Sequence, residues 1–105
     1  MIPKLVGIDF FNACERALGR VTDVVNNAGI DVIGPFLSSH EDDWDRIIAV
    51  NLVGLFNCCK AILPVLIERG GGTIINLGSD AGRVGSSGEA VYSATKGGVI
   101  AFTKT

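Results

Sequence analysis

The sequence predicts an α/β protein built on a parallel β-sheet. Two short apolar runs rich in β-branched residues, at 21–26 and 73–77, each lead into a loop that contains glycine, which is typical of buried parallel strands. Between them, residues 43–69 form a long apolar stretch with helical character. The 105 residues are 48% hydrophobic and include fourteen glycines, so the composition favours a single buried domain over a disordered chain.

The charge and the cysteine content argue against several classes of protein. A net charge of −2 without a basic cluster argues against a nucleic-acid partner. The three cysteines, Cys14, Cys58 and Cys59, are odd in number and show no spacing typical of a metal site, so a reducing, cytoplasmic location fits best. Because no stretch reaches ~18 uninterrupted apolar residues, we expect no membrane span.

The amino-terminal residues 1–11 give no clear signal, because Pro3 and Gly7 are expected to break a helix. Residues 12–18 contain good helix formers. Gly19 follows them at the position where a helix cap in left-handed geometry is expected. The sequence therefore predicts a short helix that ends before the first strand.

The first predicted strand ends in the segment Asn26-Asn27-Ala28-Gly29. Taken alone, this segment is an ordinary turn, because asparagine and glycine are common turn residues. The residue types also suit a ligand site. The Asn27 amide can bond the neighbouring backbone, while Ala28 and Gly29 leave room for another group to approach closely.

Residues 30–39 are expected to form a loop, after which Ser38 or Ser39 caps a helix with acidic residues in its first turn. His40, the single histidine, lies at this helix start. We interpret it as a surface residue rather than a catalytic base or a ligand. Trp44 is expected to pack the helix start onto the fold.

The long helical stretch at 43–69 carries apolar side chains on more than one face. A helix that covers one side of a sheet needs a single apolar stripe, so the excess indicates a second buried face and a partner subunit. Asn51 lies within this stretch. Its amide is costly to bury without partners, so it is either satisfied by the backbone or holds a water molecule.

The second predicted strand leads to residues that can carry chemistry. Ser79 lies at its carboxyl end, where open α/β sheets bind ligands, and its hydroxyl could hold a substrate oxygen. Residues 90–102 are predicted to be helical, which places Tyr92 and Lys96 one above the other on one face. An ammonium near a phenol oxygen favours its ionised form, so the pair is a candidate proton-transfer device. Taken alone, such a pair is more often packing with a solvated charge.

The loop at 80–89 is expected to line the substrate side of the site. Arg83 is a candidate partner for an anionic substrate group, and the alternative interpretation is a local salt bridge. The glycines of this loop are not a nucleotide fingerprint, because no Gly-x-Gly-x-x-Gly follows a strand anywhere in the chain.

Four elements in order then carry a specific resemblance: the segment Asn26-Asn27-Ala28-Gly29, Asn51, Ser79, and the segment Tyr92-Ser93-Ala94-Thr95-Lys96. From about residue 12 to residue 105 the chain resembles the short-chain dehydrogenase/reductase family. Within this family it is most similar to 3-oxoacyl carrier-protein reductases and cyclic hydroxyacyl-CoA dehydrogenases. The resemblance implies part of a Rossmann-like, doubly wound parallel sheet, with the central strands and helices only.

The resemblance also implies an activity, which is reversible hydride transfer between NAD or NADP and a secondary alcohol, a ketone or an acyl-thioester substrate. Tyr92 would be the general acid/base, and Lys96 would assist it and bind the nicotinamide ribose. Ser79 would hold the carbonyl oxygen, and Asn51 would support a water relay. The segment Asn27-Ala28-Gly29 would lie against the adenosine side of the cofactor.

One departure from the family pattern is clear, because the glycine-rich strand-turn-helix that holds the cofactor pyrophosphate is missing, as are the later strands. We therefore expect residues 1–105 to be a partial NAD(P)-binding domain, either an internal fragment or a truncated gene product, without activity when isolated. The family commonly forms homodimers or homotetramers through the long helix and the tyrosine helix. The alternative is a non-enzymatic remnant that retains only these dimerisation helices.

Overall fold

The structure is a computed structural model, and it describes residues 6–105. In chain order, the elements are α1 (Val6–Leu18), β1 (Asp23–Asn26), a 3-10 turn (Phe36–Ser38), α2 (Glu41–Ile48), a π-helical turn (Ala49–Val53), α3 (Gly54–Glu68), β2 (Thr73–Asn76), α4 (Ala81–Val84) and α5 (Ala90–Lys104). Both predicted strands and the long helix are thus confirmed. The strands are shorter than predicted at one end each.

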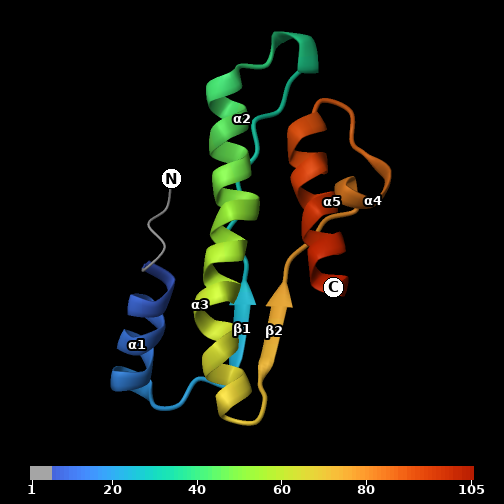
Figure 1. The fold of residues 1–105 in the computed structure, drawn as a ribbon. Coiled ribbons are helices and arrows are strands. Elements are labelled where there is room, and N and C mark those ends of the chain that lie inside the picture. Colours follow the sequence, from blue (N-terminus) through green and yellow to red (C-terminus); the bar gives the residue numbers. More distant parts are fainter. Residues whose placement is uncertain (1–5) are drawn as a thin grey trace.

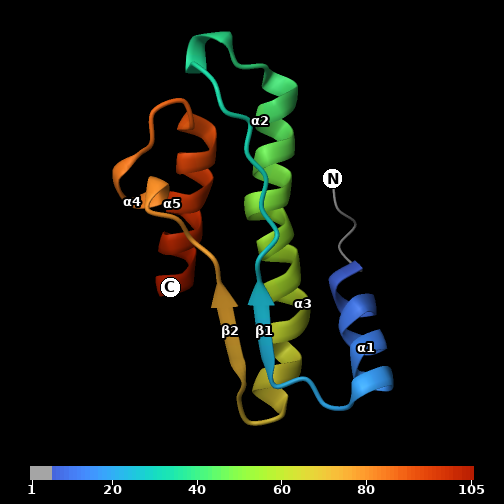
Figure 2. The same cartoon turned by 180° about the vertical axis from the view of Figure 1, so that it is seen from behind.

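The two strands pair in parallel, with Val24 opposite Ile74 and Val25 opposite Ile75. Val24 and Ile74 pack against the helices, which cover one face of the sheet (Figure 1). Figure 2 shows the strands from the other side, where no helix of residues 6–105 covers them. Val25 and Ile75 accordingly stay 57% and 47% exposed. The prediction of buried strands is therefore wrong for alternate residues, and the residues between them are only partly buried.

The helices α2 and α3 and the π-helical turn between them form one continuous column beside the sheet (Figure 1). Its inner face contributes to two apolar clusters. Ile62 and Leu66 pack with Phe11 of α1, and Leu55 packs with Val99 of α5. By length and composition the 28-residue column Glu41–Glu68 could cross a membrane, a property that core helices also have. Here the column packs on the covered face of the sheet, with contacts to α1 and to α5.

The first helix begins earlier than the sequence predicts. It includes Gly7, which was expected to break it, whereas Pro3 lies outside the described residues. Glycine in a helix interior costs only about 1 kcal/mol, which the burial of Phe11 against α3 can offset. The end of the helix is as predicted. Gly19 has a φ of 96° and donates its N–H to the Glu15 carbonyl at 3.1 Å.

The predicted serine cap of α2 is wrong. The residue before the helix is His40, and in the described chain it makes no side-chain cap hydrogen bond. The Ser39 hydroxyl instead donates to the Phe36 carbonyl and accepts the indole N–H of Trp44 at 2.8 Å. Trp44 also stacks on Phe36, with ring centroids 5.5 Å apart. His40 is exposed, in agreement with its interpretation as a surface residue.

Candidate functional site

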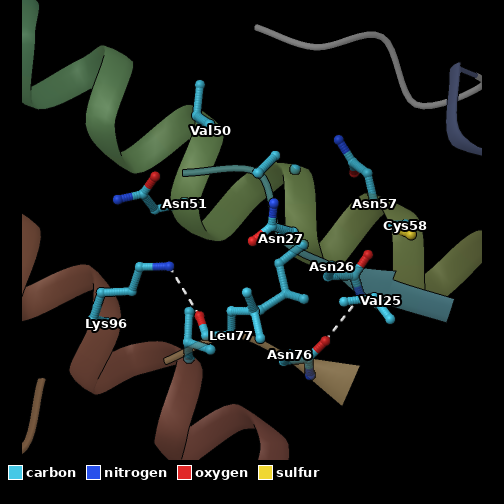
Figure 3. Close-up of a pocket in the computed structure, with 14 residues that line it drawn as sticks. Val25, Asn26, Asn27, Val50, Asn51, Asn57, Cys58, Asn76, Leu77 and Lys96 are labelled. Carbon is cyan, nitrogen blue, oxygen red and sulfur yellow. Dashed lines mark hydrogen bonds between the residues drawn. The ribbon is translucent and has the colours of Figure 1, made fainter. Parts of the chain in front are cut away.

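The carboxyl end of β2 and the residue after it bond α5 at Thr103 and Lys96, and two hollows lie beside this junction. An inner cavity of about 240 Å³ extends between the sheet and the long helix (Figure 3). An outer, more open hollow of about 340 Å³ lies beyond the strand ends. Both hollows are bordered by Asn27, Leu77 and Lys96. These three residues therefore mark the centre of the candidate site.

Lys96 occupies the middle of the site on α5. It is 5% exposed, and its Nζ donates to the Leu77 carbonyl at 2.9 Å, the bond drawn in Figure 3. Burial lowers the pKa of the Lys96 ammonium below its ordinary value. An ammonium has three N–H donors, and one of them bonds the Leu77 carbonyl. A buried amine at the border of two hollows is well placed to bind a polar group of a ligand.

Tyr92 lies one helical turn before Lys96 and borders the outer hollow, as the predicted helix requires. The Lys96 Nζ is 5.8 Å from the centroid of the Tyr92 ring. The ring is partly buried, and its phenol belongs to the same open hollow as the ammonium. The expected juxtaposition of these two side chains is therefore present, and it gives a phenol and a cation to one site.

Asn51 lies in the π-helical turn and is 2% exposed. Its Oδ1 accepts the Ile30 N–H at 2.9 Å, and its Nδ2 donates to the Ile30 carbonyl and to the Thr95 hydroxyl, both at 3.0 Å. Of the two alternatives from the sequence, the structure shows bonds to the backbone, at Ile30, with the Thr95 hydroxyl as a further partner. The amide ties the loop after β1 to α5.

The segment after β1 comes close to the reactive side chains. Asn27 borders both hollows, Ala28 the inner one and Gly29 the outer one. A Cβ atom on Gly29 would lie 3.4 Å from the Lys96 Nζ and 3.6 Å from the Asn51 Oδ1. A side chain at this position would be in van der Waals contact with the ammonium, and glycine leaves that space open.

Of the residues expected to act in catalysis or to bind the cofactor, Ser79 alone borders neither hollow. It follows β2, and its Oγ accepts the N–H of Ala81 at 3.2 Å, at the start of the short helix α4. Its neighbour Gly78 borders the outer hollow in its place. The serine is therefore beside the site, with its hydroxyl hydrogen free in direction to serve a second acceptor.

Two acidic residues that the sequence analysis did not single out, Asp31 and Glu89, also border the outer hollow. Burial, with the neighbouring Glu89, raises the pKa of Asp31 to about 6, while the hydrogen bond from Asp31 lowers the pKa of Glu89. The two residues are far apart in the chain. No local pattern could have paired them, although Glu89 directly precedes the helix that carries Tyr92.

Arg83 forms an ion pair with Asp80 at 3.2 Å, and both side chains are largely exposed. The local salt bridge is thus the interpretation that the structure supports, and no ligand needs to be invoked for this arginine. Among residues 6–105, no group of three or more metal-binding side chains occurs. Cys14, Cys58 and Cys59 are all unpaired, and burial raises the pKa of the Cys58 thiol.

Comparison with known families gives a match to the short chain dehydrogenase family over residues 8–105. The chain is 47% identical over 90 residues to the inactive 2-(S)-hydroxypropyl-CoM dehydrogenase 2 of Xanthobacter autotrophicus, covering 86% of this chain and 39% of that protein. It is 45% identical over 87 residues to a 3-oxoacyl-acyl-carrier-protein reductase of Staphylococcus epidermidis, covering 83% of this chain and 36% of that protein.

A solved structure has the same fold. A gluconate 5-dehydrogenase from Burkholderia cenocepacia, in complex with NADP and tartrate, superimposes with a TM-score of 0.88 at 35% identity. The match covers 97% of this chain and 40% of that one, so the chain spans well under half the length of the proteins it resembles. The α/β architecture predicted from the sequence is therefore confirmed as part of a Rossmann-type dehydrogenase fold.

Proposed function

This chain belongs to the short chain dehydrogenase family, and on that premise we propose that it carries the proton-transfer half of a nicotinamide-dependent oxidoreductase site. The observation that carries the proposal is the outer hollow. It brings Tyr92 and Lys96 together with Gly29 at the carboxyl ends of two parallel strands, where such folds bind ligands. The reaction is hydride transfer between NAD or NADP and a secondary alcohol or ketone.

In this proposal Tyr92 gives a proton to the carbonyl oxygen during reduction and removes it from the alcohol during oxidation. Lys96, whose Nζ lies 5.8 Å from the phenol ring, stabilises the phenolate and binds the ribose hydroxyls. Ser79 orients the substrate oxygen by donating its hydroxyl hydrogen. When bound, the nicotinamide supplies or accepts the hydride.

The residues at the site fit the nicotinamide end of such a cofactor. Gly29 leaves the space beside the Lys96 ammonium, and the Leu77 carbonyl holds the amine at the border of both hollows. Asn27 and Ala28 line the inner cavity beside it. We propose NAD or NADP without distinguishing between the two.

For Asn51 we propose a role that differs in part from the one the resemblance implies. Its amide is engaged by Ile30 and Thr95, so any water of a proton relay would be held by the main chain of the π-helical turn. The side chain instead holds the loop after β1, and hence Asn27 and Gly29, beside α5.

The substrate proposed is a small alcohol or ketone, or an acyl thioester, since the relatives include a 3-oxoacyl-acyl-carrier-protein reductase. Such a reaction fits a cytoplasmic location, as does the absence of disulfides from the described chain. We also propose a homodimer or homotetramer. Phe36, Trp44 and Leu52 border an apolar hollow of about 380 Å³ between the long helix and α5, which a second copy could cover.

The test uses a chimera in which residues 8–105 replace the corresponding segment of the Staphylococcus epidermidis reductase. We expect this chimera to oxidise NADPH or NADH with a ketone or a 3-oxoacyl thioester. Tyr92→Phe should lower kcat by about 10²–10⁴-fold, the usual contribution of general acid/base catalysis, and leave cofactor binding nearly unchanged. Ser93→Ala, which removes the neighbouring hydroxyl, is the matched control. Substantial turnover by the Phe variant would remove Tyr92 from the mechanism.

A second candidate is a non-enzymatic remnant that keeps the helix interface. The observation in its favour is that the similar Xanthobacter protein is itself named inactive. Sequencing the DNA on both sides of these codons distinguishes the two cheaply. An upstream, in-frame sequence that encodes a β-strand followed by a Thr-Gly-x-x-x-Gly-x-Gly turn supports the enzyme. A stop codon there supports the remnant, as would a folded chimera without turnover.

A further inference from the structure

We propose that Thr95 is a positioning residue that holds the turn of α5 between Tyr92 and Lys96 in its working orientation, by anchoring this turn to Asn51. The inference rests on the proposed function, since it concerns how the same phenol and ammonium are oriented. It adds a residue to which the sequence analysis assigned no role of its own.

Thr95 is 1% exposed, so its side chain is fully buried. A buried hydroxyl without partners costs ~1–3 kcal/mol, so its hydrogen bonds decide whether the residue stabilises its surroundings. The Oγ1 of Thr95 accepts from the Asn51 Nδ2 at 3.0 Å and donates to the Tyr92 carbonyl at 2.8 Å. The hydroxyl thus connects the residue proposed as acid/base to another helix.

This connection continues to the first strand. The Asn51 amide bonds both the N–H and the carbonyl of Ile30, directly after Gly29. The next residue on α5, Lys96, bonds the Leu77 carbonyl after the second strand. Two consecutive residues of α5 therefore attach the helix to the segments that follow the two strands, Thr95 through Asn51 and Lys96 directly.

Two attachments restrain the helix more than one does. Consecutive helical residues point about 100° apart, so the Thr95 bond restrains the turn between Tyr92 and Lys96 in a direction that the Lys96 contact does not. A local rotation of this part of the helix would move Tyr92 relative to the strand ends, even though Val99 and Thr103 still hold the later part of α5. Removing the Thr95 hydroxyl should accordingly change the position of the Tyr92 phenol and the burial of the Lys96 ammonium, without creating a cavity in the core.

The helix contains a control for the loss of a threonine hydroxyl. Thr103 makes the same two kinds of bond, accepting from the Asn76 Nδ2 at 3.0 Å and donating to the Val99 carbonyl at 2.6 Å, but it is exposed, near the end of the helix. Thr103→Val therefore reports what the loss of such a bond from α5 does away from the site. Thr95→Ser, which keeps the buried hydroxyl, controls for the substitution at the buried position itself.

The experiment compares Thr95→Val, Thr95→Ser and Thr103→Val in the chimera described above. We expect Thr95→Val to lower kcat by about tenfold, as for one lost buried hydrogen bond, and to shift the alkaline limb of the pH profile. Thr95→Ser keeps the hydroxyl and should restore both values to near those of the parent. Thr103→Val should leave kcat and the pH profile unchanged.

A second measurement does not depend on activity. The Ile30 N–H is bonded to Asn51, so its hydrogen exchange should become several-fold faster in Thr95→Val and stay the same in Thr103→Val. Equal loss of kcat in the two valine variants, or unchanged exchange at Ile30, would overturn the proposal. If the parent chimera has no turnover, the proposed function fails, and exchange at Ile30 still decides the role of Thr95.

Discussion

Lys96 is the residue at which the two hollows meet, and its environment explains why a lysine suits this position. The amine reaches the Leu77 carbonyl through a flexible stem and stays 5% exposed beside Gly29. A guanidinium is larger and planar, and it would approach the Gly29 backbone more closely than a compact ammonium does. The position therefore demands both the charge and the small head group.

Substitution of this lysine tests the proposed coupling to Tyr92. In the chimera, Lys96→Met should move the alkaline limb of alcohol oxidation to higher pH, because the cation that favours the phenolate is lost. Cofactor affinity should also fall. Lys96→Arg should be milder but not silent. Rates measured from pH 6 to 10 and cofactor titration check this, and an unchanged profile in the Met variant would argue against the coupling.

A second charged residue is important for stability rather than for chemistry. Both carboxylate oxygens of Glu15, near the end of α1, accept from Arg69 after α3, and Oε2 also accepts the Val21 N–H. The Arg69 guanidinium, together with the Val21 N–H, holds the pKa of Glu15 down at about 2. Arg69 also lies 5.7 Å from the centroid of the Phe11 ring. The pair connects α1 to the long helix.

The pH dependence of this pair follows from the direction of the shift. A depressed carboxyl pKa adds stability above the unfolded value near 4.5, and this contribution is lost as pH falls towards about 2. In the chimera, Glu15→Gln should therefore lower Tm at pH 7 and have a shrinking effect towards pH 2. The exposed pair Asp80–Arg83 offers the control Asp80→Asn, which should change Tm little. Equal effects of the two variants at pH 7 would contradict the assignment.

At the scale of elements, α4 and α5 approach each other through glycine. A Cβ atom on Gly82 would lie 2.5 Å from the Gly97 nitrogen and 2.7 Å from the Lys96 carbonyl oxygen. The Gly82 N–H also bonds the Ser79 carbonyl at 3.0 Å. The contact therefore sets the distance between the segment of Ser79 and the helix of Tyr92 and Lys96, since backbone cannot move aside as a flexible side chain can.

Gly82→Ala should thus separate the two helices. We expect the free energy of unfolding to fall by about 1–3 kcal/mol, as is typical of overpacking. We also expect a lower kcat, because Ser79 shifts relative to Tyr92. Gly34→Ala is the matched control, since a Cβ atom there meets nothing within 4 Å and its φ is not positive. Denaturant midpoints and steady-state rates in the chimera check both effects. A silent Gly82→Ala would mean that the helices can separate without cost.

At the scale of the whole molecule, the chain exposes more surface than its mass requires. A compact 11.0 kDa protein exposes roughly 5,600 Å², and this chain exposes 6921 Å². Its radius of gyration is 15.2 Å, compared with about 13 Å for a compact chain of this length. Part of the excess lies on the bare face of the two strands, visible in Figure 2.

We therefore expect residues 1–105, expressed alone, to aggregate rather than to form a stable monomer. The outer edges of the paired strands offer unpaired backbone groups, and Val25 and Ile75 offer apolar surface. We also expect no NAD(P)H binding and no oxidoreductase activity. Light scattering, NADPH and NADH fluorescence titrations and a thermal melt check this, with the chimera as the control. A cooperative melt that rises with cofactor would contradict the expectation.

Local patterns in the sequence determined both strands, the long helix and the part of the site that lies on α5, but not the start of α1 or the short helix α4, which forms within the expected loop at 80–89. β-branched runs located both strands, Gly19 marked the end of α1, and helical spacing placed Tyr92 one turn from Lys96. These features depend on residues within a few positions of each other, whose relation is set by backbone geometry. The family could be recognised for the same reason, since its motifs are short segments.

Tertiary structure alone decided the contacts between segments that lie far apart. The bond between Asn51 and Thr95 spans 44 positions, and the acidic pair of Asp31 and Glu89 is equally non-local. Tertiary structure also left Ser79 beside the hollow rather than on it. Such relations depend on how helices pack on the sheet, and no periodicity along the chain encodes them. The bare face of the sheet has the same origin, because burial depends on which elements are present to cover a strand.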